Sequence, residues 1–296
     1  MKRKDQLVFQ QVSREQAQAH ETRQPLFKKL AKELGRPVVS FFTSFRYPVM
    51  IEDADAAMLE GVLQKMDLSD GFALVVSSPG GDGLAAERII NICRSYSGTG
   101  DFWAIVPAKA KSAATMVCFG ASKIMLGTTS ELGPIDPQVT LTEDDTVKRF
   151  SACNIIDSYR DLFSRAVKEK GNLQPYLQQL SNYDERDIKE LQTAVELSQD
   201  IAVRTLSDGM MKGTAAATIK KNIEIFLTPK QKKAHGSPIY ADEAISCGLN
   251  IEKVDVTGTI WELVYELYIR SDNFVSTHAA KCIETTDHSF SARMKS

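Results

Sequence analysis

The sequence predicts an α/β protein of repeated strand–turn–helix units, with a mostly parallel sheet and a helical arm. Two apolar runs, FALVV at 72–76 and FWAIV at 102–106, are each followed by a turn and then by helical periodicity. A third short run, IML at 124–126, follows the second of these helices. Strands that alternate with short helices in this way form layered α/β folds with parallel pairing.

The segments before these strands predict a helix, a strand and a second helix. Residues 5–34 are polar with sparse apolar positions, which indicates a frayed lead and a surface helix that ends near Gly35. Residues 38–45, VVSFFTSF, are rich in β-branched and aromatic residues and predict a buried strand. Residues 53–66 carry apolar side chains at helical spacing after an acidic first turn, which predicts a helix.

The second half of the chain predicts mainly helices. Helical spacing runs through residues 147–169 and 184–211, and we expect these helices, joined by a loop at 171–175, to form the arm. Three shorter helices are expected after the arm, at 214–227, 242–247 and 258–269. The polar residues 271–296 predict a loose tail.

We expect one large domain with an extension at each end. A chain of 296 residues with 43% hydrophobic content can bury a full core. The expected divisions are a polar, helical extension at 1–36, a main domain at 37–256 that includes the arm at 147–211, and a C-terminal helix with its tail at 257–296.

Composition excludes several classes of protein. The 36 basic residues nearly balance the 38 acidic ones, so no basic field is available and nucleic acid is not an expected partner. No run approaches the roughly 20 apolar residues of a membrane helix, and the first 24 residues lack the apolar core of a signal peptide. The five cysteines form no CxxC pair, which suits free thiols in a reducing compartment. These features predict a soluble, cytoplasmic protein.

No motif predicts a metal, a cofactor or a nucleotide. The sequence has no HExxH motif and no clustered Asp and His spacing, and the acidic TEDDT at 142–146 is interpreted as a solvated loop. It also has no GxxxxGK[ST] motif, so we expect the isolated chain to act without ATP.

The first turn that can carry chemistry is SSPGGDG at 77–83, which ends the strand at 72–76. Gly80 and Gly81 can adopt backbone angles closed to other residues and let another segment approach closely. Such a turn can aim a free N–H at a developing negative charge, as an oxyanion hole requires. Taken alone, the motif is more often an ordinary tight turn.

The second such turn contains Ser112, which opens the helix in AKAKSAATMVCFGA at 108–121. The three residues that follow, Ala113, Ala114 and Thr115, are small and leave room for a substrate beside the hydroxyl. The N–H of Ala113 points to the place where an oxyanion would lie. Taken alone, a serine at this position is more often a helix cap.

Together the two turns resemble the plan shared by Clp protease, signal peptide peptidase A and the crotonase superfamily, and most closely the serine dehydrogenase proteinase family. The resemblance covers about residues 38–254 and rests on five ordered motifs: SSPGGDG, KSAATM with CFGA, KIMLG, SELGPIDPQ and HGSPIYADEAISCGL.

The resemblance implies a Clp/crotonase-like fold and a serine endopeptidase. By it, Ser112 matches the nucleophile, and the Gly80 and Gly81 turn with the Ala113 amide matches the oxyanion hole. It also implies a homo-oligomer and peptide or protein substrates, with membrane proteins among the candidates.

The general base stays open between two residues. Where the Clp pattern has a histidine, this chain has Asp136, so the Clp triad is not simply present. Relatives of signal peptide peptidase A use a lysine, and Lys148, expected at the start of the helix after GPIDPQ, is one candidate. The other is His235, in a His-x-x-Pro-Ile context that resembles the family's, with Asp136 as its orienting carboxylate. Lys111 is discounted because its side chain should leave the turn in another direction.

Two other functions fit parts of the sequence. A crotonase-like acyl-CoA-binding enzyme would use the same hole to stabilise an enolate, although that chemistry needs no nucleophile at Ser112. A catalytically silent oligomeric scaffold is expected if no base reaches Ser112.

Overall fold

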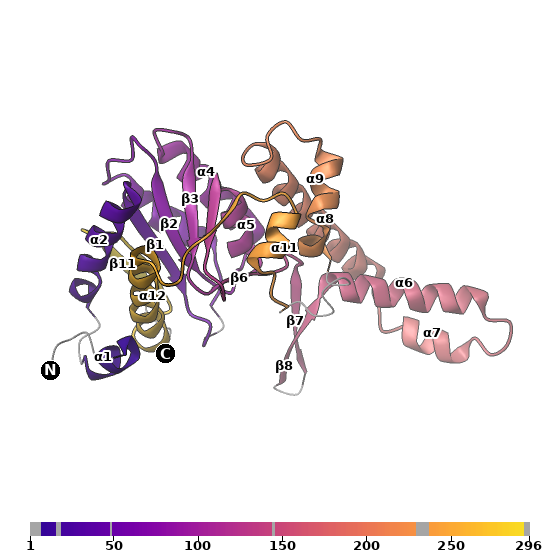
Figure 1. The fold of residues 1–296 in the computed structure, drawn as a ribbon. Coiled ribbons are helices and arrows are strands. Elements are labelled where there is room, and N and C mark those ends of the chain that lie inside the picture. The colour runs from indigo at the N-terminus through magenta and orange to yellow at the C-terminus, as the bar shows by residue number, and fades with distance from the viewer. Residues whose placement is uncertain (1–6, 16–18, 48, 144–145, 229–236, 293–296) are drawn as a thin grey trace.

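The computed structural model describes residues 7–15, 19–47, 49–143, 146–228 and 237–292, with the backbone alone at 140–143 and 146–149 (Figure 1). Its centre is a seven-stranded sheet in the order β11-β10-β1-β2-β3-β5-β9. Five strands are parallel: β1 (Val38–Thr43), β2 (Phe72–Ser77), β3 (Phe102–Val106), β5 (Lys123–Leu126) and β9 (Ile251–Lys253). The predicted α/β fold with a mostly parallel sheet is confirmed.

Helices cover both faces of this sheet. One face carries α3 (Asp53–Leu63), α4 (Gly83–Tyr96) and α5 (Ala113–Phe119), and the other carries α2 (Gln24–Leu34) and α12 (Thr259–Thr277). Every residue of β1 and β2 is therefore buried, because parallel strands covered on both faces have no solvent side. Neighbouring residues of β1 contribute to different cores, Phe41 to the first and Phe42 to the second.

The N-terminal segment forms α1 (Val8–Arg14), the short 3₁₀ helix η2 (His20–Thr22) and α2. Leu26, Phe27 and Leu30 of α2 are buried against the sheet. The helix ends at Gly35, whose left-handed φ of 68° makes it the C-cap, as the sequence predicts.

An arm projects from the other side of the body (Figure 1). It consists of the antiparallel hairpin β7 (Gln138–Glu143) and β8 (Thr146–Ser151), followed by α6 (Ala152–Lys168), α7 (Gln174–Leu180) and α8 (Glu185–Ser207). The predicted helical start at 147 was wrong. Residues 147–151 pair with β7, and the helix begins only at 152, where the Ser151 hydroxyl accepts the Asn154 N–H at 3.1 Å as an N-cap.

The remaining elements are short. They are the two-residue strands β4 (Lys109–Ala110) and β6 (Glu131–Leu132), and the helices α9 (Ala216–Asn222), α10 (Glu224–Leu227) and α11 (Ala241–Ser246). None of the helices in the described residues is long and apolar enough to cross a membrane.

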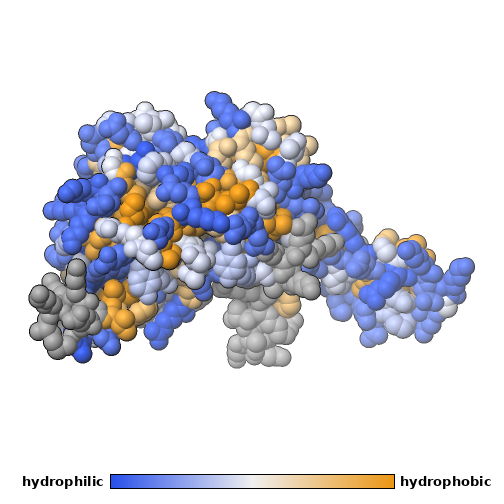
Figure 2. Space-filling view, viewed as in Figure 1, coloured by the Kyte–Doolittle hydropathy of each residue, from blue (hydrophilic) through white to orange (hydrophobic). Residues whose placement is uncertain are grey.

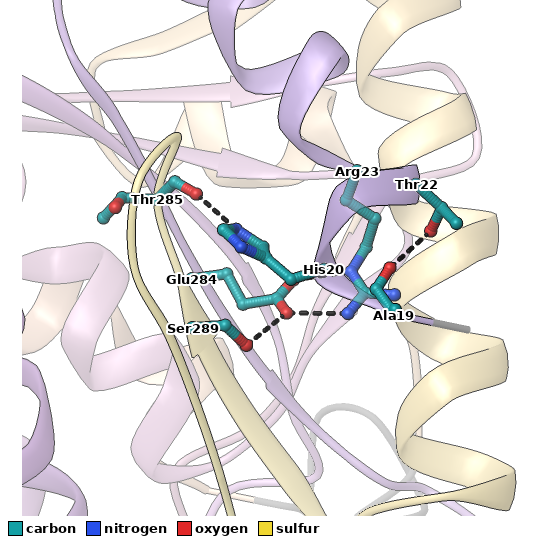
Figure 3. Close-up of polar contacts among 7 residues, drawn as sticks. All are labelled: Ala19, His20, Thr22, Arg23, Glu284, Thr285 and Ser289. Atoms are coloured by element: carbon teal, nitrogen blue, oxygen red, sulfur yellow. Dashed lines mark hydrogen bonds and ion pairs between the residues drawn. The ribbon is translucent and has the colours of Figure 1, made fainter. Parts of the chain in front are cut away.

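The prediction of a loose tail was wrong for residues 271–292. Helix α12 continues to Thr277, and β10 (Lys281–Glu284) and β11 (Ser289–Ala292) extend the sheet, with β10 antiparallel to β1. Glu284 is buried because it pairs with the equally buried Arg23: Nε lies 2.6 Å from Oε2 and Nη2 lies 2.7 Å from Oε1 (Figure 3).

Candidate active site

Ser112 lies at a sharp turn between β4 and α5. Its φ of 50° and ψ of −121° make it the one non-glycine residue with positive φ among the described residues. Such a conformation is strained and persists only where the surrounding structure fixes it. Two backbone bonds do so: the Ser112 N–H donates to Pro134 O at 3.2 Å, and the Lys111 N–H donates to Ser78 O at 3.0 Å.

Thr115, in the first turn of α5, connects this helix to both neighbouring segments. Its buried hydroxyl oxygen lies 2.8 Å from Ala110 O and 3.0 Å from Gly133 O, and it accepts the Gly133 N–H at 3.1 Å. Sequence reasoning considered Thr115 only as a small residue. Its hydroxyl stabilises the turn that presents Ser112.

Gly80 and Gly81 lie where two backbone segments approach from opposite sides. A Cβ at Gly80 would lie 2.5 Å from Lys111 O and 2.7 Å from the Ser112 Cβ, and the φ of Gly80 is 98°. A Cβ at Gly81 would lie 2.3 Å from the backbone N and O of Ile51. Glycine is required at both positions, because a side chain at Gly80 would overlap the Lys111–Ser112 backbone and one at Gly81 would overlap Ile51.

The amides of this turn have different partners. The Gly80 N–H donates to Ser78 Oγ at 3.1 Å. The Ile51 N–H donates to Gly80 O at 2.8 Å, and Ile51 O accepts the Asp82 N–H at 2.9 Å. Since successive residues of an extended segment direct their polar groups to opposite sides, the Gly81 N–H points away from Ile51. That is the side of β4 and Ser112, because Ser78 bridges to Ala110.

Two backbone donors next to Ser112 thus have no acceptor among the described residues, the N–H groups of Gly81 and Ala113. The space that a Gly80 Cβ would occupy is 3.0 Å from Ala113 N, so the two turns are in contact. Asp82 completes the first turn by capping α4, since its Oδ1 accepts the N–H groups of Leu84 and Ala85.

A cleft of about 370 Å³ opens in front of Ser112. The Pro79–Leu84 turn forms one wall of the cleft, and Met116, Ile135 and α8 form others. Most of its side chains are apolar: Phe45, Tyr47, Val49, Met50, Leu84, Met116, Ile135, Leu197 and Ile201.

Lys111, the neighbour of Ser112 in sequence, is directed elsewhere. Its Nζ lies 2.8 Å from Glu131 Oε1 and 3.4 Å from Leu132 O. Burial lowers the pKa of Lys111, and the Glu131 carboxylate opposes that shift. This agrees with the expectation that the Lys111 side chain leaves the turn in another direction.

The two base candidates have different positions. Lys148 lies in β8 opposite Leu141. The prediction that it starts a helix was therefore wrong. His235 lies outside the described residues. Asp136 is 1% exposed, and its Oδ1 accepts the Cys153 N–H at 3.3 Å. No lysine or histidine is among the described residues that line the cleft.

The described residues contain no group of three or more His, Cys, Asp or Glu that could hold a metal ion. All five cysteines are among the described residues and none forms a disulfide; four are buried and Cys153 is half-buried.

Two comparisons with known proteins bear on this site. A family model described as ClpP-like SDH-type serine proteinase matches residues 32–283, a span that contains both turns, the arm and most of β10. An uncharacterized protein of Methanocaldococcus jannaschii is 25% identical over 240 residues, which cover 79% of this chain and 68% of that protein.

Proposed function

The chain belongs to the ClpP-like SDH-type serine proteinase family, and from this we propose that it is a serine endopeptidase with Ser112 as its nucleophile. One observation carries the proposal: the strained Ser112 is next to two backbone N–H groups without acceptors among the described residues, those of Gly81 and Ala113. A strained nucleophile beside preorganised donors is the arrangement that acyl transfer requires.

In the proposed reaction, Ser112 Oγ attacks the carbonyl carbon of a peptide bond and gives its proton to the general base. The negative charge that develops on the carbonyl oxygen is stabilised by the N–H groups of Gly81 and Ala113. The base returns the proton to the leaving amine, which leaves an acyl-enzyme ester on Ser112. Water, deprotonated by the same base, then hydrolyses the ester and restores the serine.

Gly80 has a different part in this proposal. Its N–H is engaged by Ser78, so it shapes the turn while Gly81 donates. The sequence assigned the hole to the Gly80 and Gly81 turn together, and the bonding pattern favours Gly81.

The base stays a choice between Lys148 and His235. The rate at which a fluorophosphonate probe labels Ser112 should rise with pH as the base loses its proton. A midpoint near pH 6.5 would favour the histidine, and a midpoint at higher pH would favour the lysine. We expect one of Lys148→Ala and His235→Ala to lose labelling without losing its folded structure. If both variants keep the wild-type rate, both assignments are wrong.

The apolar lining of the cleft supports apolar peptide segments as substrates. Leu197 and Ile201 of α8 line the cleft with aliphatic side chains, and Leu197 is 42% exposed. Burying such surface on a substrate contributes roughly 25 cal/mol per Å² before the entropy cost of binding.

We also propose a homo-oligomer formed through the arm. Phe163, Val167 and Leu177 are 51%, 69% and 53% exposed there, and hydrophobic residues stand among hydrophilic ones on the arm in Figure 2. Exposed apolar residues gathered on one projection are typical of a protein interface. Sedimentation velocity tests this: we expect wild type to sediment as an oligomer and Phe163→Glu to sediment with a smaller molecular mass. The same molecular mass for both proteins would contradict the proposal.

A fluorophosphonate probe tests the proposed function directly, because it phosphonylates an activated serine and needs no known substrate. We expect wild type to be labelled and Ser112→Ala to be unlabelled. Ser198→Ala is the matched control, since Ser198 lines the same cleft and should be dispensable. Folded wild-type protein that is labelled no faster than Ser112→Ala would refute the proposal.

A further inference from the structure

A buried lysine of the C-terminal strand is bonded to the segment behind the Gly80 and Gly81 turn. Lys281, the first residue of β10, is 3% exposed. Its Nζ lies 2.6 Å from Glu52 Oε1 and 2.8 Å from Asp55 Oδ2. Asp55 is fully buried, and its Oδ2 also accepts the Glu52 N–H at 2.8 Å. Lys281 therefore fixes both the side chain and, through Asp55, the main chain of Glu52.

Glu52 directly follows the residue that supports the turn. Ile51 forms hydrogen bonds with both residues that flank Gly81: its N–H donates to Gly80 O, and its O accepts the Asp82 N–H. The two backbones are in contact, since a Cβ at Gly81 would lie 2.3 Å from Ile51 atoms. A displacement of Ile51 would therefore displace Gly81 and change the direction of its N–H.

Two further bonds connect the C-terminal segment to the cleft wall, by which we mean residues 44–47 and 49–52. The Ser44 N–H donates to Ala280 O at 2.9 Å, and the Tyr47 hydroxyl donates to Ser276 O at 3.2 Å. Tyr47 lines the cleft in front of Ser112. The cleft wall is thus held at its start, in its middle and at its end by residues 276–281.

We propose that Lys281 is a positioning residue for the reaction: by anchoring Glu52 and Asp55 it holds Ile51 against Gly81 and so orients the Gly81 N–H toward the oxyanion. This inference rests on the proposed function for its catalytic consequence. Its structural part, the support of the turn by Ile51, stands on the contacts alone.

Amide hydrogen exchange tests the structural part without any substrate. In Lys281→Met the apolar stem remains but the ammonium is lost, and we expect the amides of Ile51 and Asp82 to exchange at least about 10-fold faster. Lys281→Arg, which can still bind both carboxylates, should restore slow exchange.

Glu284→Gln is the matched control, because it weakens another buried ion pair on the same strand, the one with Arg23 (Figure 3). Glu284 makes none of the contacts with the cleft wall, which come from residues 276–281. It should leave exchange at Ile51 and Asp82 unchanged. Equal acceleration in both variants would mean that β10 was loosened as a whole, and the inference would be wrong. If Lys281→Met does not fold, Glu52→Gln, at a side chain 67% exposed, removes one of the two carboxylates and should accelerate the same amides.

The catalytic part is tested by steady-state kinetics on a peptide substrate. We expect Lys281→Met to lower kcat at least about 10-fold with a smaller change in KM, because a misdirected oxyanion donor costs stabilisation mainly in the transition state. Lys281→Arg should recover most of kcat. An active wild type with unchanged kcat in Lys281→Met would overturn the positioning role, whereas a wild type that fluorophosphonate does not label would refute the proposed function and leave the exchange result standing.

Discussion

The backbone of Gly80 lies directly against Ser112, so that a Cβ on Gly80 would be only 2.7 Å from the Ser112 Cβ. Gly80→Ala should therefore push the two turns apart and slow fluorophosphonate labelling by about 100-fold, similar to the loss of an oxyanion donor. Gly61→Ala in α3, where a Cβ would meet nothing within 4 Å, should keep the wild-type rate. Labelling of Gly80→Ala at the wild-type rate would show that the contact has no catalytic role.

The positive φ of Ser112 predicts an unusual order of stability among its variants. Ser112→Ala and Ser112→Gly both lose the hydroxyl, but glycine alone adopts a φ of 50° and ψ of −121° without strain. We expect the glycine variant to have the larger free energy of unfolding, by about 1 kcal/mol. Urea denaturation of the two variants measures this difference. An alanine variant of equal or greater stability would contradict the strain at this turn.

The apolar cleft predicts a loss of activity on apolar peptides when its wall becomes charged. Leu197 is 42% exposed and lines the cleft, so Leu197→Asp should lower kcat/KM by about 10- to 100-fold with little change in stability. Val256→Asp places the same charge on a residue 45% exposed outside the cleft and serves as the control. A similar fall in both variants would argue against substrate binding at Leu197.

Burial predicts which cysteines react. Burial raises the pKa of Cys118 to about 12, because a thiolate in the apolar core is poorly solvated. Raising the pH from 7 to 9 should therefore not deprotonate the Cys118 thiol. Iodoacetamide should instead modify the half-buried Cys153 first. Mass spectrometry of the native protein reads this out. Alkylation of Cys118 at the rate of a free thiol would contradict the packing of α5.

The core of the fold was predictable because its strands are short apolar runs that end in turns. Residues 72–76 and 102–106 are buried on both faces, so they read as strands without any long-range information. The turns that carry Gly80, Gly81 and Ser112 were predictable because they follow directly where these apolar runs end. Which amide of the turn is free was not, since it depends on Ile51 and on the Ser78 side chain.

The C-terminal strands and the hairpin were missed for physical reasons. Lys281 and Glu284 carry charges that suggest an exposed segment, yet each is buried against a partner more than 200 positions away in the sequence. Such a pairing leaves no local periodicity. In β8 the apolar residues Val147 and Phe150 are three positions apart, which is a helical spacing, so the periodicity of α6 extends without a break into the strand.

Strand β10 also bears on when this protein becomes competent during synthesis. Its partner β1 is made early, and about 240 residues separate Ser40 from the Glu284 that pairs with it. Until the ribosome has added the residues of β10, the edge of β1 opposite β2 has no neighbouring strand. Lys281 is then not available to bond Glu52 and Asp55. We therefore expect the nascent chain to acquire its catalytic arrangement last, which delays peptide cleavage until translation of β10 is complete.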